Sequence, residues 1–198
     1  RVAEDGEQAI ALLKKEEDSP AFAVGSYDGV TEEYPNYIQG EEEFAPRNVT
    51  MPFVMYRPSV KFKVSCGKSL GKVYDPYFTR NYRHFSSHQH TPNKLEPSKY
   101  DAGVLTDNIL YFAHPVFLIY ALYGNVILKD FILKGIFALI NDVSPLKTNL
   151  PSQGRVFLME QMEEKRYVAH ALYANVIQRG MDTESQDSRE CSTREIEI

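Results

Sequence analysis

The fold of this chain is constrained most by an apolar stretch, residues 109–140, that is broken twice. His114-Pro115 makes the first break and Gly124-Asn125 makes the second. Proline fits the first turn of a helix because its missing N–H has no partner there, glycine ends helices, and asparagine caps a following one. We therefore expect a strand before the first break and a helix after each break. The run up to the second break is shorter than the ~20 apolar residues that a membrane span needs, so it is predicted to form a core.

The second of these helices, predicted over residues 126–140, carries its charges on one side. These charges are Lys129, Asp130 and Lys134. The apolar side chains that cover much of the remaining circumference are Ile127, Phe131, Leu133, Ile136, Phe137 and Ile140. A helix with so wide an apolar surface must be buried on most sides. We expect it to pack against a sheet or against a second subunit.

The residues near the N-terminus indicate a mixture of helix and strand. Residues 4–17 have the pattern of a helix, and residues 21–27 have the composition of a short buried strand. A helix followed at once by an apolar strand is typical of an α/β domain. Residues 28–50 are rich in Glu, Gly, Pro and Asn and predict a long exposed excursion.

Strand-like patterns then follow up to the apolar stretch. Residues 51–64 hold two short runs of this kind, and residues 70–74 and 103–114 hold further ones. In residues 60–64 apolar side chains alternate with lysines, which predicts a strand with one buried face. The segment 103–114 predicts a strand pair or one interrupted strand.

The pattern changes again beyond Pro145. Residues 155–160 and 166–173 flank a polar turn and predict a β-hairpin. Residues 180–193 are polar and predict a loop, and residues 195–198 resume the alternation of a strand. One hairpin and the start of a strand do not make a stable sheet alone, so this β part is expected to be incomplete.

Charge, cysteine content and motifs limit the classes of function. A net charge of -5, with no run of lysine or arginine interleaved with aromatics, argues against nucleic acid as a partner. Cys66 and Cys191 are too few for a disulfide framework, and no signal peptide is visible, so we expect a cytoplasmic protein without a membrane segment. Residues 67–69 resemble the end of a phosphate-binding loop, but the first glycine of that motif would fall at Phe62. No cofactor is predicted.

Residues 74–93 are the strongest candidate for a ligand site. This segment gathers aromatic rings, two arginines and three of the chain's five histidines without a helix or strand period. Asp75-Pro76 opens it and Thr91-Pro92 closes it. Imidazoles can donate hydrogen bonds to sugar hydroxyls, and tyrosine rings stack on the apolar face of a pyranose. The candidate ligand-binding residues are His84, His88, His90, Tyr82 and Arg83.

Two other interpretations of these histidines are open. Three imidazoles could form a catalytic zinc set, but no carboxylate or cysteine lies beside them at a familiar spacing, so no metal site is predicted. They could also be surface histidines on a packed loop. Hydrogen bonding to a ligand or to a second subunit fits their aromatic and arginine neighbours better.

Three blocks of the sequence resemble successive parts of bacterial α-L-fucosidases. They are residues 75–92 (DPYFTRNYRHFSSHQHTP), residues 108–125 (NILYFAHPVFLIYALYGN) and residues 148–173 (TNLPSQGRVFLMEQMEEKRYVAHALY). The chain is similar to the C-terminal region of enzymes like those of glycoside hydrolase family 151. There, a catalytic (β/α)8 barrel is followed by a β-galactosidase trimerisation-like domain and a small β domain.

This resemblance implies an α/β domain over residues 1–143, flavodoxin-like and related to class I glutamine amidotransferases, followed over residues 144–198 by part of a small all-β domain. It also implies assembly into a trimer or a higher homo-oligomer, and a fucosylated saccharide bound through the complete enzyme. A retaining glycosidase needs two carboxylates supplied by barrel strands, and 198 residues leave no room for a barrel of ~250. No catalytic residue is therefore assigned, and hydrolysis by this chain alone is not expected.

Two other classes of function remain as alternatives. One is a stand-alone carbohydrate-binding or protein-interaction module without hydrolase activity. The other is an active amidotransferase-like enzyme, which would need a nucleophilic cysteine on a strand-to-helix turn with a histidine partner. Cys66 has no apolar helix after it, which disfavours that alternative. The sequence does not specify the sugar linkage, the number of subunits or which histidine meets the ligand.

Overall fold

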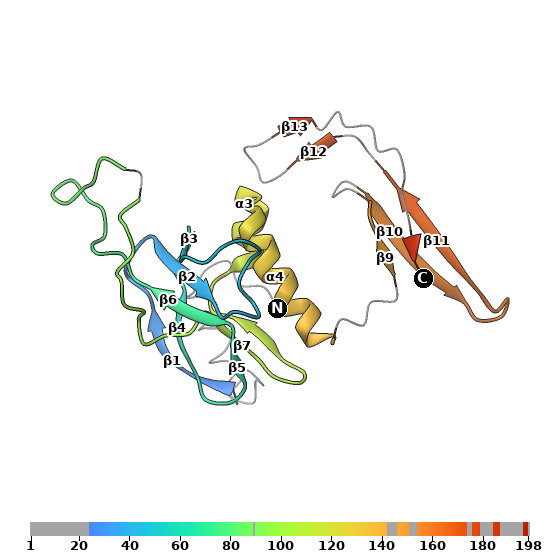
Figure 1. The fold of residues 1–198 in the computed structure, drawn as a ribbon, viewed down its shortest axis with the longest axis horizontal. Helices are drawn as coiled ribbons and strands as arrows, with labels where there is room; N and C mark the ends of the chain where they lie inside the picture. The colour runs from blue at the N-terminus through green and yellow to red at the C-terminus, as the bar shows by residue number, and fades with distance from the viewer. Residues whose placement is uncertain are drawn as a thin grey trace.

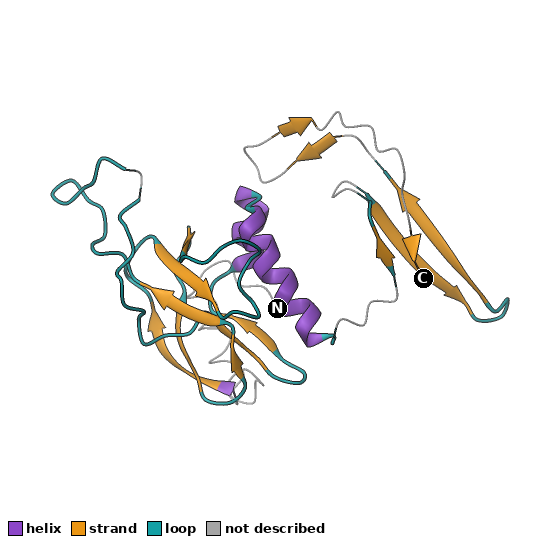
Figure 2. Ribbon diagram, viewed as in Figure 1, coloured by secondary structure: helices purple, strands orange, loops and turns teal. Residues whose placement is uncertain are grey.

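The computed structural model describes residues 24–88, 90–141, 146–150 and 154–173, together with the backbone of short strands at residues 176–178, 184–186 and 196–197. The predicted helix over residues 4–17 lies outside these ranges. In the described part the fold consists mostly of strands, with two helices packed along them (Figure 2).

The described chain up to residue 141 holds eight strands followed by two helices (Figure 1). The strands are β1 (Gly25–Val30), β2 (Asn36–Gly40), β3 (Phe53–Met55), β4 (Val60–Val64), β5 (Lys68–Ser69), β6 (Gly71–Tyr74), β7 (Gly103–Leu105) and β8 (Leu110–Phe112). The helices are α3 (Val116–Tyr123) and α4 (Val126–Leu139). The strands predicted over residues 51–64 and 70–74 are confirmed, and residues 103–114 form the predicted pair as a hairpin.

The strands associate in small sheets. β3-β2-β6 and β5-β7-β8 are three-stranded, and β1 pairs with β4. Every pair that the structure describes is antiparallel. The flavodoxin-like or amidotransferase-like class, and the boundary between residues 143 and 144, stay predictions.

The expected exposed excursion at residues 28–50 is wrong in part, because two strands run through it, while residues 41–50 form no strand. β1 continues to Val30, and β2 is the central strand of the β3-β2-β6 sheet. Ile38 in β2 and Phe44 in the following turn are almost completely buried. β2 has only five residues and lies between Pro35 and the loop after Gly40. The composition of residues 28–50 as a whole is polar and therefore does not reveal this short strand. Pairing with β3 and β6, and not local propensity, makes this run a strand.

The two breaks in the apolar stretch act as predicted. Pro115 directly precedes α3, and Gly124 ends it in the left-handed conformation at φ 59°. The Asn125 side chain caps α4, because its Oδ1 accepts hydrogen bonds from the backbone N–H of Ile127 at 2.9 Å and Leu128 at 3.3 Å.

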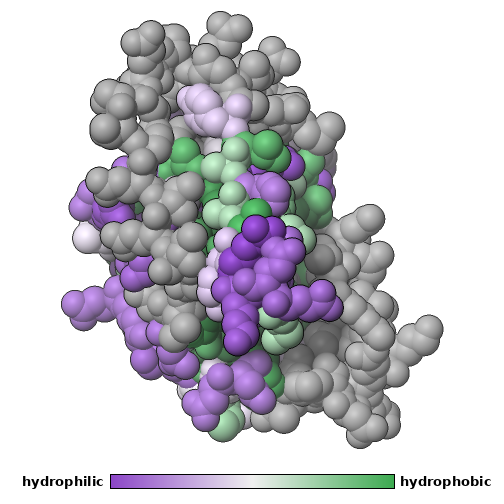
Figure 3. All heavy atoms as spheres, turned by 90° about the vertical axis from the view of Figure 1, so that its right-hand side faces the viewer, coloured by the Kyte–Doolittle hydropathy of each residue, from purple (hydrophilic) through white to green (hydrophobic). Residues whose placement is uncertain are grey.

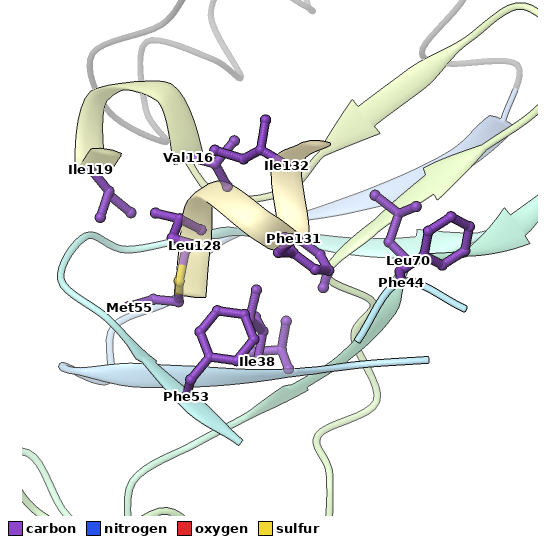
Figure 4. Close-up of a cluster of buried hydrophobic side chains, with 12 residues drawn as sticks. Ile38, Phe44, Phe53, Met55, Leu70, Val116, Ile119, Leu128, Phe131 and Ile132 are labelled. Atoms are coloured by element: carbon purple, nitrogen blue, oxygen red, sulfur yellow. The ribbon is translucent and has the colours of Figure 1, made fainter. Parts of the chain in front are cut away.

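The main core lies between α4 and the β3-β2-β6 sheet, with α3 beside it (Figure 4). The Phe131 ring of α4 meets Phe53 of β3 at a centroid distance of 5.9 Å and Phe112 of β8 at 5.7 Å. The other core side chains drawn and labelled there are Ile38, Phe44, Met55, Leu70, Val116, Ile119, Leu128 and Ile132. One helix face therefore joins two sheets.

The prediction that α4 buries most of its circumference is wrong for this chain by itself. Its buried residues are confined to one stripe: Leu128, Phe131, Ile132 and Gly135. Four of the six apolar positions expected to be buried are between 37% and 42% exposed, namely Ile127, Leu133, Phe137 and Ile140. The sheets cover only the inner side of the helix, so an apolar outer face remains.

Asp101 connects three strands of the structure. Its Oδ2 accepts a hydrogen bond from the backbone N–H of Val64 at 2.9 Å, and its Oδ1 accepts one from the Ser69 hydroxyl at 3.0 Å. The same Oδ1 lies 2.5 Å from the Lys72 ammonium. The backbone N–H of Asp101 also donates to the Phe62 carbonyl at 2.7 Å. This carboxylate is buried, and it joins β4, β5 and β6 where the sheets meet.

A buried polar network fixes the start of β2 to the segment before α3. His114 Nε2 lies 2.8 Å from Asn36 Oδ1, and Asn36 Nδ2 donates to the hydroxyls of Thr31 and Ser59. The Asn36 oxygen is therefore the acceptor, so the imidazole is protonated on Nε2. His114 Nδ1 is then an unprotonated acceptor, and it has no hydrogen-bond partner in the part of the chain that the structure describes.

Acid should destabilise the fold through this histidine. Burial lowers the pKa of His114 from 6.5 to about 3. The unfolded chain therefore binds the proton first, so the contribution of neutral His114 is complete above pH 6.5 and is lost as pH falls toward 3. We expect a loss of about 1.4 kcal/mol per pH unit between pH 6 and 4 from this group.

Urea unfolding at several pH values measures this slope. His114→Gln should reduce it, whereas the control His170→Gln, at an exposed position on the C-terminal hairpin, should keep the slope of the original protein. Equal slopes for all three proteins would contradict the role given to His114.

The C-terminal strands form separate antiparallel pairs. They are β9 (Lys147–Thr148), β10 (Arg155–Gln161), β11 (Arg166–Leu172), β12 (Val176–Gln178), β13 (Glu184–Gln186) and β14 (Ile196–Glu197). The predicted hairpin is confirmed as β10–β11, and β14 pairs with β9. The loop expected at residues 180–193 contains β13, which pairs with β12, so that expectation was wrong in part.

Apolar side chains on this part of the structure face outward. Phe157 and Met159 of β10 are more than half exposed, and so is Leu172 of β11. Figure 3 shows hydrophobic and hydrophilic surface side by side in the view from this side. No helix among the described residues is long and apolar enough to cross a membrane.

Candidate functional site

Residues 75–93 form a loop that leaves and rejoins the fold at one place (Figure 1). Pro76 and Asn93 form an isolated antiparallel bridge. The backbone N–H of Tyr77 donates to the Pro92 carbonyl at 3.0 Å, and that of Lys94 donates to the Asp75 carbonyl at 2.8 Å. The two prolines that bound the segment in the sequence therefore lie next to each other at its base.

The outer part of the loop is organised around Asn81. Its Oδ1 accepts hydrogen bonds from the backbone N–H groups of Arg83 and His84, both at 2.9 Å. Its own N–H donates to the His84 carbonyl at 2.8 Å. Arg80 Nη1 donates to the His88 carbonyl at 3.2 Å, which ties the turn to the returning side of the loop. An asparagine is well suited to such a turn because its short side chain can bond to backbone two or three residues on.

The loop encloses one side of a hollow of about 1090 Å³. We call this space the loop hollow; its lining residues are Tyr34, Pro35, Tyr56, Arg80, Asn81, Tyr82, Phe85, His90, Tyr123 and Asn125. The fold outside the loop supplies the opposite side, from the residues before β2, after β3 and around the end of α3. The volume is slightly above the ~300–1,000 Å³ that ligand sites usually span.

Three rings in tilted contact form one wall of the loop hollow. The Tyr56 ring lies 5.2 Å from the His90 ring and 4.9 Å from the Tyr123 ring, measured between centroids. The Tyr56 hydroxyl is 3.1 Å from His90 Nε2. This hydrogen bond joins the returning side of the loop to the residue after β3 and fixes the plane of the imidazole.

The structure separates the five predicted ligand-binding residues. His90 and Tyr82 line the loop hollow, and the Arg83 guanidinium lies 5.1 Å from the centre of the Tyr82 ring. His84 and His88 are not among the residues that line it. The His84 ring is 6.2 Å from the Phe78 ring, and the His88 carbonyl accepts from Arg80 and Ser86.

Sequence reasoning missed the half of the hollow that lies outside the loop. Tyr34, Tyr56 and Tyr123 line the hollow but are far from the loop, and from one another, in the sequence. No local motif marks any of them. One signal in the sequence was Gly124-Asn125, which predicted the end of α3 and the start of α4. This pair therefore also marked Tyr123 and Asn125 as residues at a helix end.

The loop hollow offers hydrogen-bond donors and aromatic faces. Burial raises the pKa of the Tyr34 hydroxyl, so it is protonated at neutral pH and can donate. No aspartate or glutamate is among the described residues that line the hollow. A glycosidase acid/base pair requires two carboxylates, so these lining residues can bind a saccharide but cannot supply that pair. In the described part of the chain no group of three or more His, Cys, Asp or Glu side chains is placed to hold a metal ion.

Comparison with known proteins finds a relative among solved structures. No protein family and no curated protein matches the chain. The structure superimposes with a TM-score of 0.77 and 30% sequence identity on an α-L-fucosidase, isoenzyme 2 from Paenibacillus thiaminolyticus. The match covers 90% of this chain and 27% of the fucosidase chain. The chain is similar in fold and sequence to part of an α-L-fucosidase. It spans about a quarter of that enzyme's length.

Proposed function

We propose that this chain is a non-catalytic region of a glycoside hydrolase of the α-L-fucosidase type, and that its loop hollow contributes to saccharide binding. The observation that carries the proposal is the likeness to part of an α-L-fucosidase at 30% identity over 90% of this chain. Membership of glycoside hydrolase family 151 is part of the same proposal. The catalytic carboxylates are proposed to lie outside these 198 residues.

The chemistry of the loop hollow supports a binding role. A deoxy sugar such as fucose has polar hydroxyls and an apolar edge with a methyl group. The wall formed by Tyr56, His90 and Tyr123 can stack against that edge, while the tyrosine hydroxyls and the imidazole can bond to the hydroxyls. Of the three loop histidines, His90 is therefore the one proposed to meet the sugar.

The outer face of α4 supports a role in assembly. Leu133, Phe137 and Ile140 leave an apolar surface on a helix that is well packed on its inner side. Exposed apolar surface on one side of a helix is typical of protein–protein contacts. We therefore propose that this face takes part in a homo-oligomer, a trimer or a higher assembly. A cytoplasmic location stays a prediction.

Kinetics on the full-length gene product test the binding role. With an aryl α-L-fucoside as substrate, His90→Ala should raise KM about tenfold, because a hydrogen bond and a ring contact worth about 1.4 kcal/mol are lost. The matched control is His170→Ala, an exposed histidine on the C-terminal hairpin, which should leave KM and kcat unchanged. Unchanged kinetics for His90→Ala would contradict the binding role.

The alternative is a carbohydrate-binding or protein-interaction module that belongs to no hydrolase. The lack of carboxylates among the described lining residues is also compatible with such a module. A gene product that binds L-fucose but cleaves no fucoside would favour this alternative. A gene product that cleaves fucosides, combined with no cleavage by the 198-residue chain alone, would favour the proposed function.

A further inference from the structure

Among the described residues that line the loop hollow, the permanently charged side chain is an arginine. Arg80 lines the hollow with a permanent positive charge, and no carboxylate is among its described lining residues. Burial raises the pKa of Tyr34 and the nearby charge of Arg57 lowers it, which places Arg57 within electrostatic reach of the Tyr34 hydroxyl. In a partly enclosed space these charges attract an anion more strongly than they would on an open surface.

Two asparagines in the lining present donors and not acceptors. The Oδ1 of Asn125 is occupied by the first N–H groups of α4, and the Oδ1 of Asn81 by the backbone of the loop turn. Each amide nitrogen carries two N–H donors. The hydroxyls of Tyr34 and Tyr123 can add further donors. The polar lining therefore suits a ligand that is rich in acceptor oxygens.

Asp75 lies at the base of the loop and is not among the described residues that line the hollow. Burial is the largest cause of the raised pKa of Asp75; the charge of Glu33 raises this pKa further, and the charges of Lys94 and Lys61 lower it. Neither Asp75 nor Glu33 is among the described residues that line the hollow.

From this combination of cations, donors and rings we propose that the loop hollow binds saccharides that carry an anionic group, a sulfate ester or a carboxylate. The inference rests on the proposed function, since it names the class of saccharide that the same hollow takes. Arg80 binds the anionic group, and the rings of Tyr56 and Tyr123 contact the sugar. The same charge disfavours sugars that carry a free, protonated amine.

Isothermal titration calorimetry on the full-length protein tests the inference. The probes are methyl α-L-fucoside, its 4-sulfate, methyl β-D-glucuronide, methyl β-D-glucoside and inorganic sulfate. The sulfated fucoside should bind about tenfold more tightly than the neutral fucoside, and added salt should reduce this difference. If the glucuronide binds more tightly than methyl β-D-glucoside, the preference extends to carboxylates; a preference confined to the sulfated sugar identifies the anion as sulfate.

Arg80→Gln should abolish the preference for the anionic sugar, and the readout is the ratio of the affinities for sulfated and neutral fucoside within the same variant. The matched control, Arg47→Gln, removes an exposed arginine outside the lining and should retain the preference. Equal affinities for sulfated and neutral fucoside would overturn this inference but not the proposed function. Failure to bind any saccharide would overturn both, and binding of inorganic sulfate as tightly as the sulfated sugar would overturn the saccharide part of the inference.

Discussion

Phe131→Ala should lower the free energy of unfolding by about 4 kcal/mol, because it removes a fully buried ring from the centre of the core. The ring contacts Phe53 and Phe112, which belong to different sheets. A shift of one sheet into the cavity left by the ring would weaken its packing against the other sheet. We therefore expect the cavity to close only in part. Denaturant unfolding followed by circular dichroism measures the loss.

The same helix provides the control. Phe137 is 42% exposed on the outer face of α4, so Phe137→Ala should cost less than about 1 kcal/mol in a monomer. If both substitutions cost the same, the assignment of inner and outer faces is wrong. A larger effect of Phe137→Ala that depends on protein concentration would instead show that the outer face is buried in an oligomer.

Asp101→Ala should lower the free energy of unfolding by about 3 kcal/mol. The substitution leaves the backbone N–H of Val64 and the Ser69 hydroxyl without their acceptor. It also removes the partner of the Lys72 ammonium. Because the carboxylate joins β4, β5 and β6, the loss affects the junction of the sheets and not one turn.

Asp101→Asn distinguishes the parts of this contribution. The amide keeps an acceptor oxygen but loses the charge, so it should recover part of the stability while the Lys72 contact weakens. The control Asp107→Ala removes a carboxylate from an exposed position and should change the unfolding free energy by less than about 0.5 kcal/mol. If Asp101→Ala is as stable as the control, the Asp101 carboxylate does not stabilise the junction of β4, β5 and β6.

Local chemistry allowed much of the fold to be predicted. The alternation in residues 60–64, the breaks before α3 and α4, and the C-terminal hairpin are all set by neighbouring residues, and all are confirmed. β2 was missed because its strand character depends on pairing with β3 and β6. The outer face of α4 was misjudged because periodicity shows that a face is apolar but not whether anything covers it.

The candidate site was predictable only in part, for a similar reason. The loop is visible in the sequence because its rings and histidines all fall within one short segment. Tyr56 and Tyr123 are brought to the loop by the sheet and by the end of α3, and no pattern in their own surroundings distinguishes them from core tyrosines. The choice of His90 over His84 and His88 likewise depended on which imidazole meets Tyr56.

The bridge between Pro76 and Asn93 has a consequence for how this protein can vary. The loop departs and returns through adjacent residues, so replacing or lengthening residues 77–91 changes little in the distance that the chain must close. Such a segment can be replaced by another of different length or composition while the strands and helices at its base keep their positions. Related proteins could therefore acquire different ligand preferences by changing this one segment, while α4 and the sheets beneath it stay the same.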